Sequence, residues 1–564
     1  MQKRWVVKQA DENVVTELQS TLGIHPVLCK LLVQRGVKTF DEARTFFRPS
    51  LEQLHDPFLM KNMDKAISRI EKAFGNGEKI LIYGDYDVDG TTSVALVYSF
   101  FRTIYPTNID YYIPNRYTEG YGISTAGIDY AKEKNITLII ALDCGIKSID
   151  KIDYANSLNI DFIICDHHLP GDEVPKAHAV LDPKQIDCNY PFKELSGCGI
   201  GFKLIQAYSQ KNNLPLAELE NYLDLVTVSI ASDIVPITGE NRVLAHFGLK
   251  KINTNPSKGL KALKEICAVK KDMSISDIVF VLGPRINAAG RMDDAKHAVR
   301  LLLAETSENA NSGADILNKK NVERREHDLT TTEEALAMLD DVEEQQNKKS
   351  TVLYQPHWHK GVIGIVASRL MDSFYRPTII LTKSNGHVAG SARSVHGFNI
   401  YEAIKECSDL LDQYGGHFFA AGLTMQEENV EAFTKKFEEV VSRTITEDSL
   451  TPEILIDAEI ELEDLTQKFY NIAAQFSPFG PDNMKPVFVT RHVTDSGFSR
   501  IVGQHHIKMA IKKKNSVIIN GIAFGMHEKI KLMSEKKEFD ICYTIEENEW
   551  NGQKKLEINV RDLK

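Results

Sequence analysis

The sequence predicts an α/β protein of several domains: a parallel-sheet lobe, a long connecting helix, a smaller α/β lobe and a C-terminal β-barrel. The chain has 564 residues, which at about 150 residues per domain corresponds to three or four domains. Short apolar runs alternate with helix-like segments in two separate regions, as they do in parallel α/β sheets. The last part of the chain instead contains segments of alternating polarity, which are typical of antiparallel strands.

The first α/β region follows a stretch of short helical patterns and turns over residues 1–70. The apolar run KILIY (79–83) precedes a helix-like segment, and two similar runs follow further along the chain. These three runs stop at Asp85, Asp143 and Asp166. We expect these aspartates to line a ligand crevice, because the carboxyl ends of strands form the crevice of an open α/β sheet. A helix N-cap explains any single Asp more simply, but three successive strand ends weaken that explanation.

The rest of the chain divides by pattern. Residues 200–300 look mainly helical, a polar helical stretch follows, and a second α/β unit begins at STVLYQP (350–356). Beyond a linker at 444–453, alternating segments such as PVFVTRHVTDSGF and KKLEINVRDL predict a small barrel of OB type. The expected parts are an N-terminal helical segment packing on the first lobe, the first lobe, the connecting stretch, the second lobe and the barrel, at 1–70, 71–297, 298–348, 349–447 and 452–564.

Composition limits the class of protein. Lys and Arg number 67 and Asp and Glu 78, a formal net charge of −11, which argues against indiscriminate coating of nucleic acid but allows a confined basic channel. The eight cysteines form no C-x-x-C pair, and scattered thiols fit a reducing compartment. The sequence contains no apolar run long enough for a signal peptide or a membrane span. We therefore expect a soluble, cytoplasmic protein.

The sharpest local feature is the acidic heptapeptide GDYDVDG (84–90). Its D-x-D-x-D-G pattern opens an EF-hand loop, but that loop requires a Glu at its twelfth position, where this chain has Leu96. A carboxylate cluster at a strand-to-helix turn remains, in which Asp85 and Asp87 offer oxygen to a hard divalent cation. For the heptapeptide alone, a solvated Asp-rich turn explains the sequence equally well.

Two further turns favour a metal site. DCG (143–145) and DHH (166–168) end the other two apolar runs. A lone Asp or His is more often structural, whereas imidazole with several carboxylates is a typical ligand set for manganese and related ions. Two such ions about 4 Å apart activate a water and neutralise the leaving oxygen of a phosphoryl substrate.

These motifs resemble those of the DHH phosphoesterase superfamily, whose members are manganese- or magnesium-dependent phosphodiesterases, exonucleases and pyrophosphatases. GDYDVDG, DCG and DHH look like three of its acidic motifs, and Asp233 in ASDIVPITGENR looks like the fourth. Over nearly its whole length the chain is also similar to the bacterial 5′→3′ single-strand-specific exonucleases of this superfamily. The segments that carry this similarity are PNRYTEGYG (114–122), LSGCGIGFKL (195–204), GPRINAAGRMDDA (283–295), WHKGVIGIVASRL (358–370), GSARSV (390–395) and GGHFFAAG (415–422).

The resemblance implies a set of ligands for two divalent ions, manganese or magnesium. Carried over by motif position, the ligands are Asp85, Asp87, Asp143, His167 and Asp233, with Asp143 bridging both ions. Asp89 receives no ligand role and is expected to cap the following helix. Asp166 is expected to orient His167 from outside the ligand set. His168 would face the scissile phosphate and stabilise its developing charge.

The same resemblance implies contacts with the substrate. Arg116 and Arg285 are expected to clamp phosphate, because a guanidinium holds two oxygens at once. Ser391 and Arg393 in the second lobe resemble a pocket for the DNA 5′-phosphate. For any single Arg the alternative is a surface ion pair. For His417, a histidine satisfied within the core is nearly as good an explanation as a contact with the nucleotide.

The two lobes would then determine which bond is cut. A 5′-phosphate held in the second lobe, with metal ions in the first, implies stepwise release of 5′ mononucleotides from single-stranded DNA, in recombination and repair. The barrel would hold the downstream strand, and HHIKMAIKKKNS (505–516) is its most cationic stretch. The expected partners are single-stranded DNA with a 5′ end, a single-strand-binding protein and a RecQ-type helicase. The protein is expected to be a monomer without membrane contact.

Two other functions stay open. An oligonucleotide or cyclic-dinucleotide phosphodiesterase of the same superfamily shares the DHH and GGH motifs, but such proteins usually lack the N-terminal segment and the barrel. An inactive scaffold that binds DNA or a replisome partner would have lost ligand positions, whereas all the expected acidic positions are present here. A pyrophosphatase is disfavoured, because Leu81 stands where that family has an additional ligand His.

Overall fold

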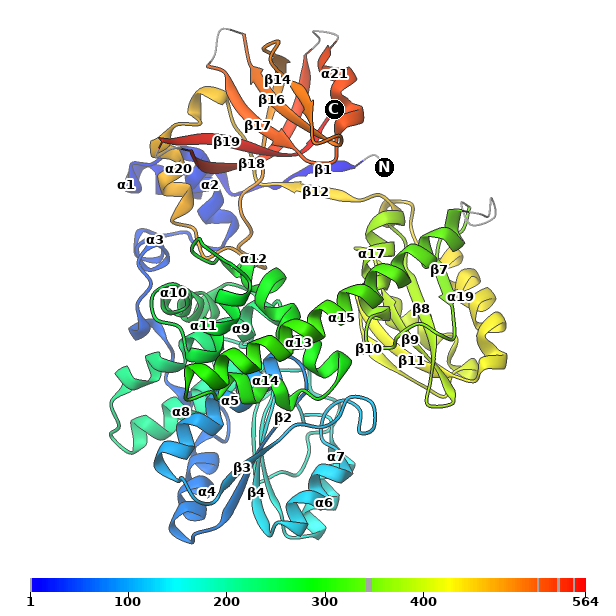
Figure 1. Ribbon diagram of the computed structural model, residues 1–564. Helices are drawn as coiled ribbons and strands as arrows, with labels where there is room; N and C mark the ends of the chain where they lie inside the picture. Colours follow the sequence, from blue (N-terminus) through cyan, green and yellow to red (C-terminus); the bar gives the residue numbers. More distant parts are fainter. Residues whose placement is uncertain (1–2, 341–346, 515–516, 535–537, 551–552) are drawn as a thin grey trace. The chain divides into compact units, whose positions relative to one another are not determined.

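The computed structural model describes residues 3–340, 347–514, 517–534, 538–550 and 553–564 (Figure 1). The chain forms two compact units. The smaller unit contains Met1–Arg4, Ala288–Asp294 and Ile316–Ile454, and the larger unit contains Trp5–Asn287, Ala295–Asp315 and Leu455–Lys564. Within the described residues, no helix has both the length and the apolar character needed to cross a bilayer.

A five-stranded parallel sheet forms the centre of the first lobe, which lies in the larger unit and confirms the predicted α/β class. Its strand order is β3-β2-β4-β5-β6. The strands are β2 (Lys79–Gly84), β3 (Ile109–Tyr112), β4 (Ile136–Leu142), β5 (Asp161–Cys165) and β6 (Ala179–Leu181). The sequence did not predict β6, because three residues are too short for a recognisable period.

Helices cover both faces of this sheet. On one face α6 (Thr125–Glu133) and α7 (Ile149–Ser157) bury their apolar sides in one core with strand residues such as Tyr83 and Ile139. On the other face lie α4 (Met63–Gly75), α5 (Val88–Ile104) and α8 (Gly197–Lys211), which pack on β6, β2 and β4 (Figure 1). The sheet is therefore buried on both sides, which explains its nearly continuous apolar strands.

The predicted helical region follows. It contains α9 (Leu223–Ser232), α10 (Gly239–Thr254), α11 (Lys258–Ile266), α12 (Ile275–Asp277), a π-helical turn η4 (Ile278–Leu282), α13 (Gly283–Met292) and α14 (Lys296–Leu302). Helix α9 is buried along its whole length and packs against α5, α8 and α10. It carries Asp233 at its C-terminal end.

The N-terminal segment differs from the expectation. It forms β1 (Arg4–Val7), α1 (Glu12–Leu22), α2 (Pro26–Gln34) and α3 (Phe40–Phe47), followed by the short turns η1 (Leu51–Gln53) and η2 (Pro57–Leu59). Apolar residues of α1 to α3, such as Leu18 and Leu32, share one hydrophobic core with Phe469 and Phe488 of the C-terminal region. These three helices thus complete the barrel's core and do not pack mainly on the first lobe. Helical periodicity shows which face is apolar but not which distant partner covers it.

The C-terminal region is a closed barrel. Strands β14 (Phe488–Asp495), β18 (Phe539–Trp550), β19 (Gln553–Leu563), β17 (Ile519–Ala523) and β16 (His506–Lys512) follow one another, and a further pairing of β14 with β16 closes the ring. Five strands in a closed ring fit the predicted OB type. The remaining elements are β12 (Glu453–Ile456), β13 (Ala458–Glu459), β15 (Arg500–Val502), α20 (Gln467–Ala474) and α21 (Ile530–Ser534). Asn515 and Ser516, part of the predicted cationic stretch, lie outside the described residues.

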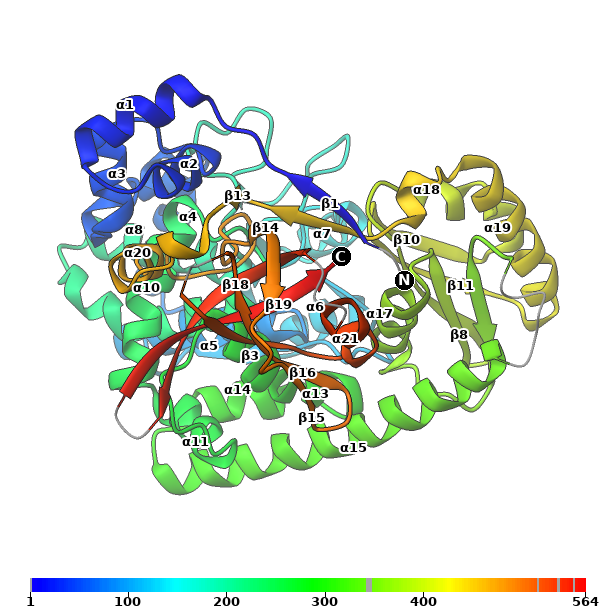
Figure 2. The ribbon, with the colours of Figure 1, turned by 90° about the horizontal axis from the view of Figure 1, so that it is seen from above.

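The smaller unit contains the second α/β lobe, a mixed sheet of order β10-β11-β9-β8-β7. Ile379 and Leu381 point into the core on one face and Ile380 into the core on the other, as strand alternation requires. Figure 2 shows α15 and α19 on opposite sides of this sheet. The elements are α15 (Ser307–Asp340), β7 (Thr351–Tyr354), α17 (Ile363–Phe374), β8 (Thr378–Ser384), β9 (His387–Arg393), α18 (Ile400–Lys405), β10 (Gln413–His417), β11 (Ala420–Met425) and α19 (Val430–Thr444). Helix α15 lies within the expected connecting stretch at 298–348, of which residues 341–346 lie outside the described residues.

Candidate metal centre

Four neighbouring strands of the parallel sheet end in register, and each is followed by an aspartate. The paired end residues are Gly84, Leu142, Cys165 and Leu181 on β2, β4, β5 and β6. The residues that follow them are Asp85, Asp143, Asp166 and Asp182. Strands β2 and β4 are neighbours although β3 is formed between them in the chain, so the strand order switches at this point. Open α/β sheets bind their ligands at such a switch point.

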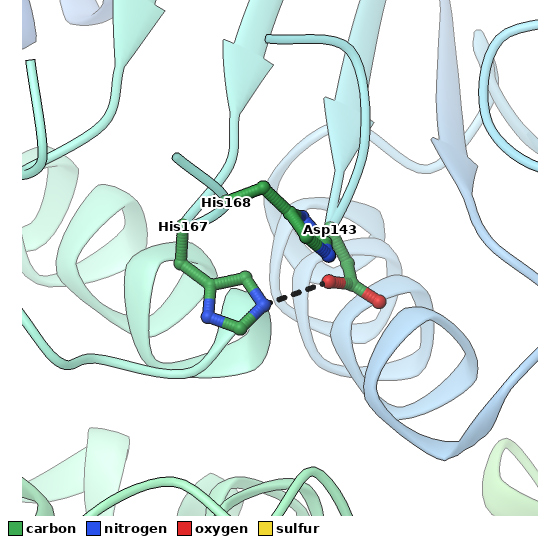
Figure 3. A group of neighbouring side chains, drawn as sticks. All are labelled: Asp143, His167 and His168. Carbon is green, nitrogen blue, oxygen red and sulfur yellow. Dashed lines mark ion pairs between the residues drawn. The ribbon is translucent and has the colours of Figure 1, made fainter. Parts of the chain in front are cut away.

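Asp143, His167 and Asp233 come together at this edge. Nε2 of His167 lies 3.2 Å from Oδ1 of Asp143 and 3.5 Å from Oδ2 of Asp233. Figure 3 shows the ring of His167 turned toward the Asp143 carboxylate. Asp143 has a φ of 59°, a left-handed conformation that non-glycine residues adopt at functional turns. Two strand ends and the end of α9 thus bring three of the predicted ligands together.

Asp85 and Asp87 reach the same region from the turn between β2 and α5. Oδ1 of Asp85 accepts a hydrogen bond from the N–H of Gly122 at 3.3 Å, and Asp87 caps α5 by accepting from the N–H of Gly90 at 3.0 Å. The turn is tight, because a Cβ at position 90 would lie 2.3 Å from the carbonyl oxygen of Asp85. The charges of both aspartates act on Asp143.

Crowding of the carboxylates makes their ionisation unfavourable. Burial raises the pKa of Asp143 well above its ordinary value, and the neighbouring carboxylates, Asp89 first among them, raise it further. The pKa values of Asp85, Asp87 and Asp233 are raised in the same way, by burial first and a neighbouring carboxylate second. Like charges held this close are stable only when protons or cations intervene.

The imidazole of His167 fits a metal ligand. Both of its ring nitrogens, and Oδ2 of Asp85, are buried without a hydrogen-bond partner. Burial lowers the pKa of His167, which favours the neutral ring that a metal ligand requires. One imidazole with several carboxylates is a typical donor set for manganese, and the carboxylate oxygens also suit magnesium. The residues present therefore fit divalent cations.

Asp166 contacts both histidines of the DHH motif: it holds the backbone of His167, the residue it was expected to orient, and also the ring of His168. Oδ1 of Asp166 lies 2.7 Å from Nδ1 of His168 and also accepts the backbone N–H groups of His167 and His168. Burial opposes ionisation, but the hydrogen bond and charge of His168, together with the N–H of Ile146, outweigh it and lower the pKa of Asp166 to about 2. The same partnership outweighs burial at His168 and raises its pKa. His168 thus carries positive charge more readily than an ordinary histidine.

Asp89 does not cap the following helix as expected. Asp87 occupies that position, and Asp89 lies inside the first turn of α5. Its carboxylate instead accepts the backbone N–H groups of Gly197 and Cys198, at the start of α8. The sequence could not show this partner, because it stands more than 100 residues away.

The two expected phosphate clamps lie in different surroundings. The guanidinium of Arg116 lies 5.1 Å from the ring centroid of Tyr86. The positive charge of Arg116 acts to lower the pKa of Asp85, against the larger effect of burial. Arg116 therefore lies beside the metal centre. Nη1 of Arg285, on α13, donates to the carbonyl of Val281 at 2.7 Å. Arg285 is therefore fixed against the π-helical turn that precedes its own helix.

The smaller unit brings Ser391 and Arg393 together beside the first turn of α17. Nη1 of Arg393 donates to Oγ of Ser391 at 3.0 Å. A Cβ at Gly364, in the first turn of α17, would lie 2.9 Å from Nη2 of Arg393 and 2.9 Å from Oγ of Ser391. Helix α17 is 12 residues long, so its N-terminus adds a partial positive charge. An arginine, a hydroxyl and a helix N-terminus together suit a phosphate group.

His417 ends β10 in the same sheet. It pairs in register with Ala420 on β11, which pairs in turn with Arg393 on β9. His417 is exposed, so it is not the core histidine that the sequence left open. Gly416 has a φ of 151°, and a Cβ there would lie 2.4 Å from the carbonyl oxygen of Ala420. The hairpin that presents His417 therefore requires glycine.

Known protein families match the three parts of the chain. The model described as "DHH family, N-terminal domain" matches residues 79–230, the DHHA1 domain matches 347–443 and the RecJ OB domain matches 456–562. The single-stranded-DNA-specific exonuclease RecJ of Bacillus subtilis is 36% identical over 99% of this chain and 70% of that protein. The chain belongs to the RecJ family. The Escherichia coli RecJ exonuclease is 32% identical over 95% of this chain and 96% of its own length.

Solved RecJ structures agree with this fold. RecJ from Thermus thermophilus in complex with Mn²⁺ superimposes with a TM-score of 0.86 at 26% identity, covering all of this chain and 79% of that one. The Mg²⁺ complex from the same organism gives a TM-score of 0.80 at 25% identity, covering 99% of this chain and 78% of that one. The RecJ fold thus occurs with both ions named by the sequence analysis.

Sequence reasoning missed three residues beside the metal centre of this RecJ-family chain. Asp182 follows β6, and burial raises its pKa to about 7. The hydroxyl of Tyr121 lies 3.1 Å from Nε2 of His168. Lys184 pairs with Glu194 at 3.2 Å, and its positive charge acts to lower the pKa values of His167 and Asp233. Tyr121 stands within the quoted segment PNRYTEGYG, so that motif contained a signal for it.

Manganese should raise the melting temperature of the protein more at about pH 8 than at about pH 6. The cluster carboxyls have raised folded-state pKa values, so metal-free stability falls as the pH rises from their ordinary pKa through the raised ones. Manganese removes this repulsion, and it competes with fewer protons at high pH. Thermal melts with EDTA and with manganese at both pH values measure the difference. An equal gain at both pH values would contradict the assignment, and Asp143→Asn should shrink the gain.

Proposed function

We propose that this protein is a single-stranded-DNA-specific exonuclease that removes 5′ mononucleotides in the 5′→3′ direction, in DNA recombination and repair. The observation that carries the proposal is the unpartnered imidazole of His167, surrounded by carboxylates at the switch point of the sheet in a RecJ-family chain. The relatives that cover nearly all of this chain are RecJ exonucleases. Digestion of end-labelled single- and double-stranded DNA, with product lengths resolved, tests strand choice and direction together.

The proposed ligands of two divalent ions are Asp85, Asp87, Asp143, His167 and Asp233. When bound, manganese or magnesium supplies the positive charge and Lewis acidity that attack of water on a phosphodiester requires. Asp143 suits the bridging position, because four of its carboxylate neighbours act on it at once. The lowered pKa of His167 favours the neutral ring, which keeps a lone pair on one ring nitrogen for coordination.

His168 is proposed to stabilise the phosphate. Its side chain is 43% exposed, and Asp166 fixes the ring through Nδ1, so Nε2 is directed toward Tyr121 and the open side of the site. A charged imidazole held in one orientation stabilises charge that develops on a phosphate oxygen. Arg116, beside Asp85, supplies a second cation for the same phosphate. Arg285 is proposed as a further phosphate contact from α13.

The 5′ end is proposed to bind in the smaller unit. Ser391, Arg393 and the first turn of α17 form the pocket for the terminal phosphate, and His417 contacts the nucleotide beside it. A terminal phosphate carries about two negative charges, so a guanidinium and a helix N-terminus select it over an internal phosphodiester. Recognition of this end gives the enzyme its direction.

The strand beyond the scissile bond is proposed to enter a cavity of about 860 Å³ in the larger unit, between the helical region and the barrel. Ile234, which follows Asp233, lines its wall, as do the aromatic residues Phe280 and Tyr470. Lys485 and Arg561 add positive charge. Aromatic surfaces with nearby cations bind the bases and backbone of single strands without sequence preference.

The remaining parts of the proposal follow the family resemblance. We propose a cytoplasmic monomer that acts with a single-strand-binding protein and a RecQ-type helicase. The proposed domains are 71–297 for catalysis, 349–447 for substrate binding and 452–564 for DNA binding, joined by 298–348. An oligonucleotide or cyclic-dinucleotide phosphodiesterase is not favoured, because residues 456–562 match the RecJ OB domain.

Asp143→Ala should abolish nuclease activity, with a loss of at least about 10²- to 10³-fold in kcat, since the centre loses a group shared by both ions. The variant should keep its fold, because removing one carboxylate reduces the electrostatic repulsion in the metal-free protein. Manganese-dependent release of nucleotides is the measurement. Asp150→Ala, an exposed aspartate shortly after the same strand, is the matched control and should keep full activity. Activity of Asp143→Ala equal to that of the control would refute the ligand assignment.

Arg393→Ala should raise KM for 5′-phosphorylated single strands by about 10- to 100-fold, the scale of one or two charge-assisted hydrogen bonds. The KM for 5′-hydroxyl strands and kcat should change little. Arg443→Ala, an exposed arginine on α19, controls for loss of charge in the same unit. If preference for the 5′-phosphate survived in Arg393→Ala, the pocket would lie elsewhere.

Phe280→Ala should weaken binding of long single strands by about 5- to 100-fold, the range for loss of one base–aromatic stack. Its side chain is 76% exposed on the π-helical turn, so removal leaves no buried void. Fluorescence anisotropy with strands of different length, in EDTA, measures the effect. Phe40→Ala, an exposed phenylalanine on α3, is the control. Equal affinity of the two variants at every length would exclude the cavity as the path of the strand.

A further inference from the structure

Asp89 is the one aspartate of the GDYDVDG turn that the proposed ligand set leaves without a role. Its side chain is 1% exposed, which is rare for a carboxylate unless it is paired or hydrogen-bonded. Oδ2 lies 3.7 Å from Nε2 of His167, so the group borders the metal centre. A buried charge in this position requires a structural explanation.

The hydrogen bonds of Asp89 come from two helices that are distant in sequence. Oδ2 accepts the N–H of Gly197 at 2.7 Å, and Oδ1 accepts the N–H of Cys198 at 2.8 Å, both in the first turn of α8. Oδ1 also accepts the hydroxyl of Ser229, on α9, at 2.7 Å. Ser93, one turn along α5, adds a longer contact at 3.4 Å. An ionised carboxylate is an acceptor only, and these donors occupy most of its capacity.

The first anchored helix supports Asp143. A Cβ at Gly197 would lie 2.7 Å from Cβ and 3.0 Å from Oδ1 of Asp143, so the backbone of α8 touches that side chain directly. The hydrogen bond from Gly197 to Asp89 therefore fixes the surface against which Asp143 rests. Since nothing larger than glycine fits there, a small shift of α8 displaces Asp143.

The second anchored helix carries Asp233. The carbonyl of Ser229 accepts the N–H of Asp233 at 2.9 Å, so the two residues are one helical turn apart on α9. The hydroxyl of the same serine is held by Asp89. Displacement of Ser229 would thus move the end of the helix from which Asp233 reaches the centre.

We propose that Asp89 is a positioning residue that sets the separation of Asp143, His167 and Asp233, and thereby the affinity of the centre for divalent ions. Asp89 acts through its hydrogen bonds to α8 and to Ser229 and through its contact with His167. The inference rests on the proposed ligand set. It assigns to Asp89 no direct bond to an ion: Oδ1 accepts Cys198 and Ser229 and Oδ2 accepts Gly197, so donors from α8 and α9 use most of the acceptor capacity of the carboxylate, although it stands within ligand distance of His167 and Asp233.

Manganese binding to the metal-free full-length protein tests the proposal without any substrate. Titration followed by electron paramagnetic resonance of free Mn²⁺ and by calorimetry gives both affinity and stoichiometry. Asp89→Asn should still bind two ions, but about 10- to 100-fold more weakly, the usual effect of removing an outer partner of a metal site. The amide keeps the volume of the side chain but directs an N–H₂ group against an N–H of α8. Saturating manganese should restore most of kcat.

Two further variants accompany it. Ser229→Ala removes one anchor and should weaken manganese binding by about 3- to 10-fold, and it carries the test if Asp89→Asn does not fold. Asp224→Asn is the matched control: Asp224 is also a buried aspartate on α9, but at the opposite end, where it accepts the N–H groups of Leu225 and Ser257. This control should melt at a lower temperature and bind manganese with unchanged affinity.

The possible results separate the alternatives. Unchanged affinity in both Asp89→Asn and Ser229→Ala would overturn the proposal. A fall in stoichiometry from two ions to one in Asp89→Asn would also overturn it, because Asp89 would then be a ligand itself. A wild-type protein that binds fewer than two ions would contradict the proposed ligand set, independently of any effect of Asp89.

Discussion

Repulsion among carboxylates drawn to one edge of a parallel sheet is the constraint on which the rest of this structure depends. The strands end in register, so the fold places their following aspartates side by side whether or not their charges are balanced. Burial removes the water that would otherwise screen them. The surrounding elements are arranged around this problem: Asp166 is neutralised locally by His168, while Asp143 and Asp233 share the imidazole of His167. The unbalanced part of the row is where divalent cations fit.

The division between balanced and unbalanced carboxylates also separates structural from chemical roles. Asp166 and Asp89 accept several backbone or side-chain donors and hold neighbouring segments in place. Asp143 lies against glycine and an imidazole, and its charge has no such partners close by among the described residues. The hydrogen-bond donors around each aspartate thus distinguish structural aspartates from those available to an ion. A motif alone does not contain that information.

Much of the fold followed from pattern. The apolar runs before Asp85, Asp143 and Asp166 are strands, since a strand buried on both faces leaves a continuous apolar run in the sequence. The alternating C-terminal segments are the strands of the barrel. Strand β6 was not predicted because it is too short to show a period. The packing of α1 to α3 into the barrel was not predicted because their partners lie more than 400 residues away.

The site was predictable to the extent that its ligands follow strands. Asp143 and His167 stand directly after apolar runs, and Asp233 was assigned only through a resemblance, since a helix end has no such signal. Sequence reasoning gave Asp89 the wrong neighbour, because it assumed a local partner, whereas the real partners lie on α8 and α9 and are set by how the helices meet in space. For Asp166 it named His167 alone, whereas the carboxylate also holds the ring of His168.

The shared core of α1 to α3 and the barrel has a consequence for biosynthesis. Leu18 and Leu32 leave the ribosome long before Phe469 and Phe488, which complete the same core. At typical bacterial elongation rates, the interval amounts to about 20 to 90 seconds. Throughout that time the nascent helices lack these partners for their apolar faces, and their final packing must await synthesis of the barrel strands. The earliest and latest parts of this core therefore become native together, and late.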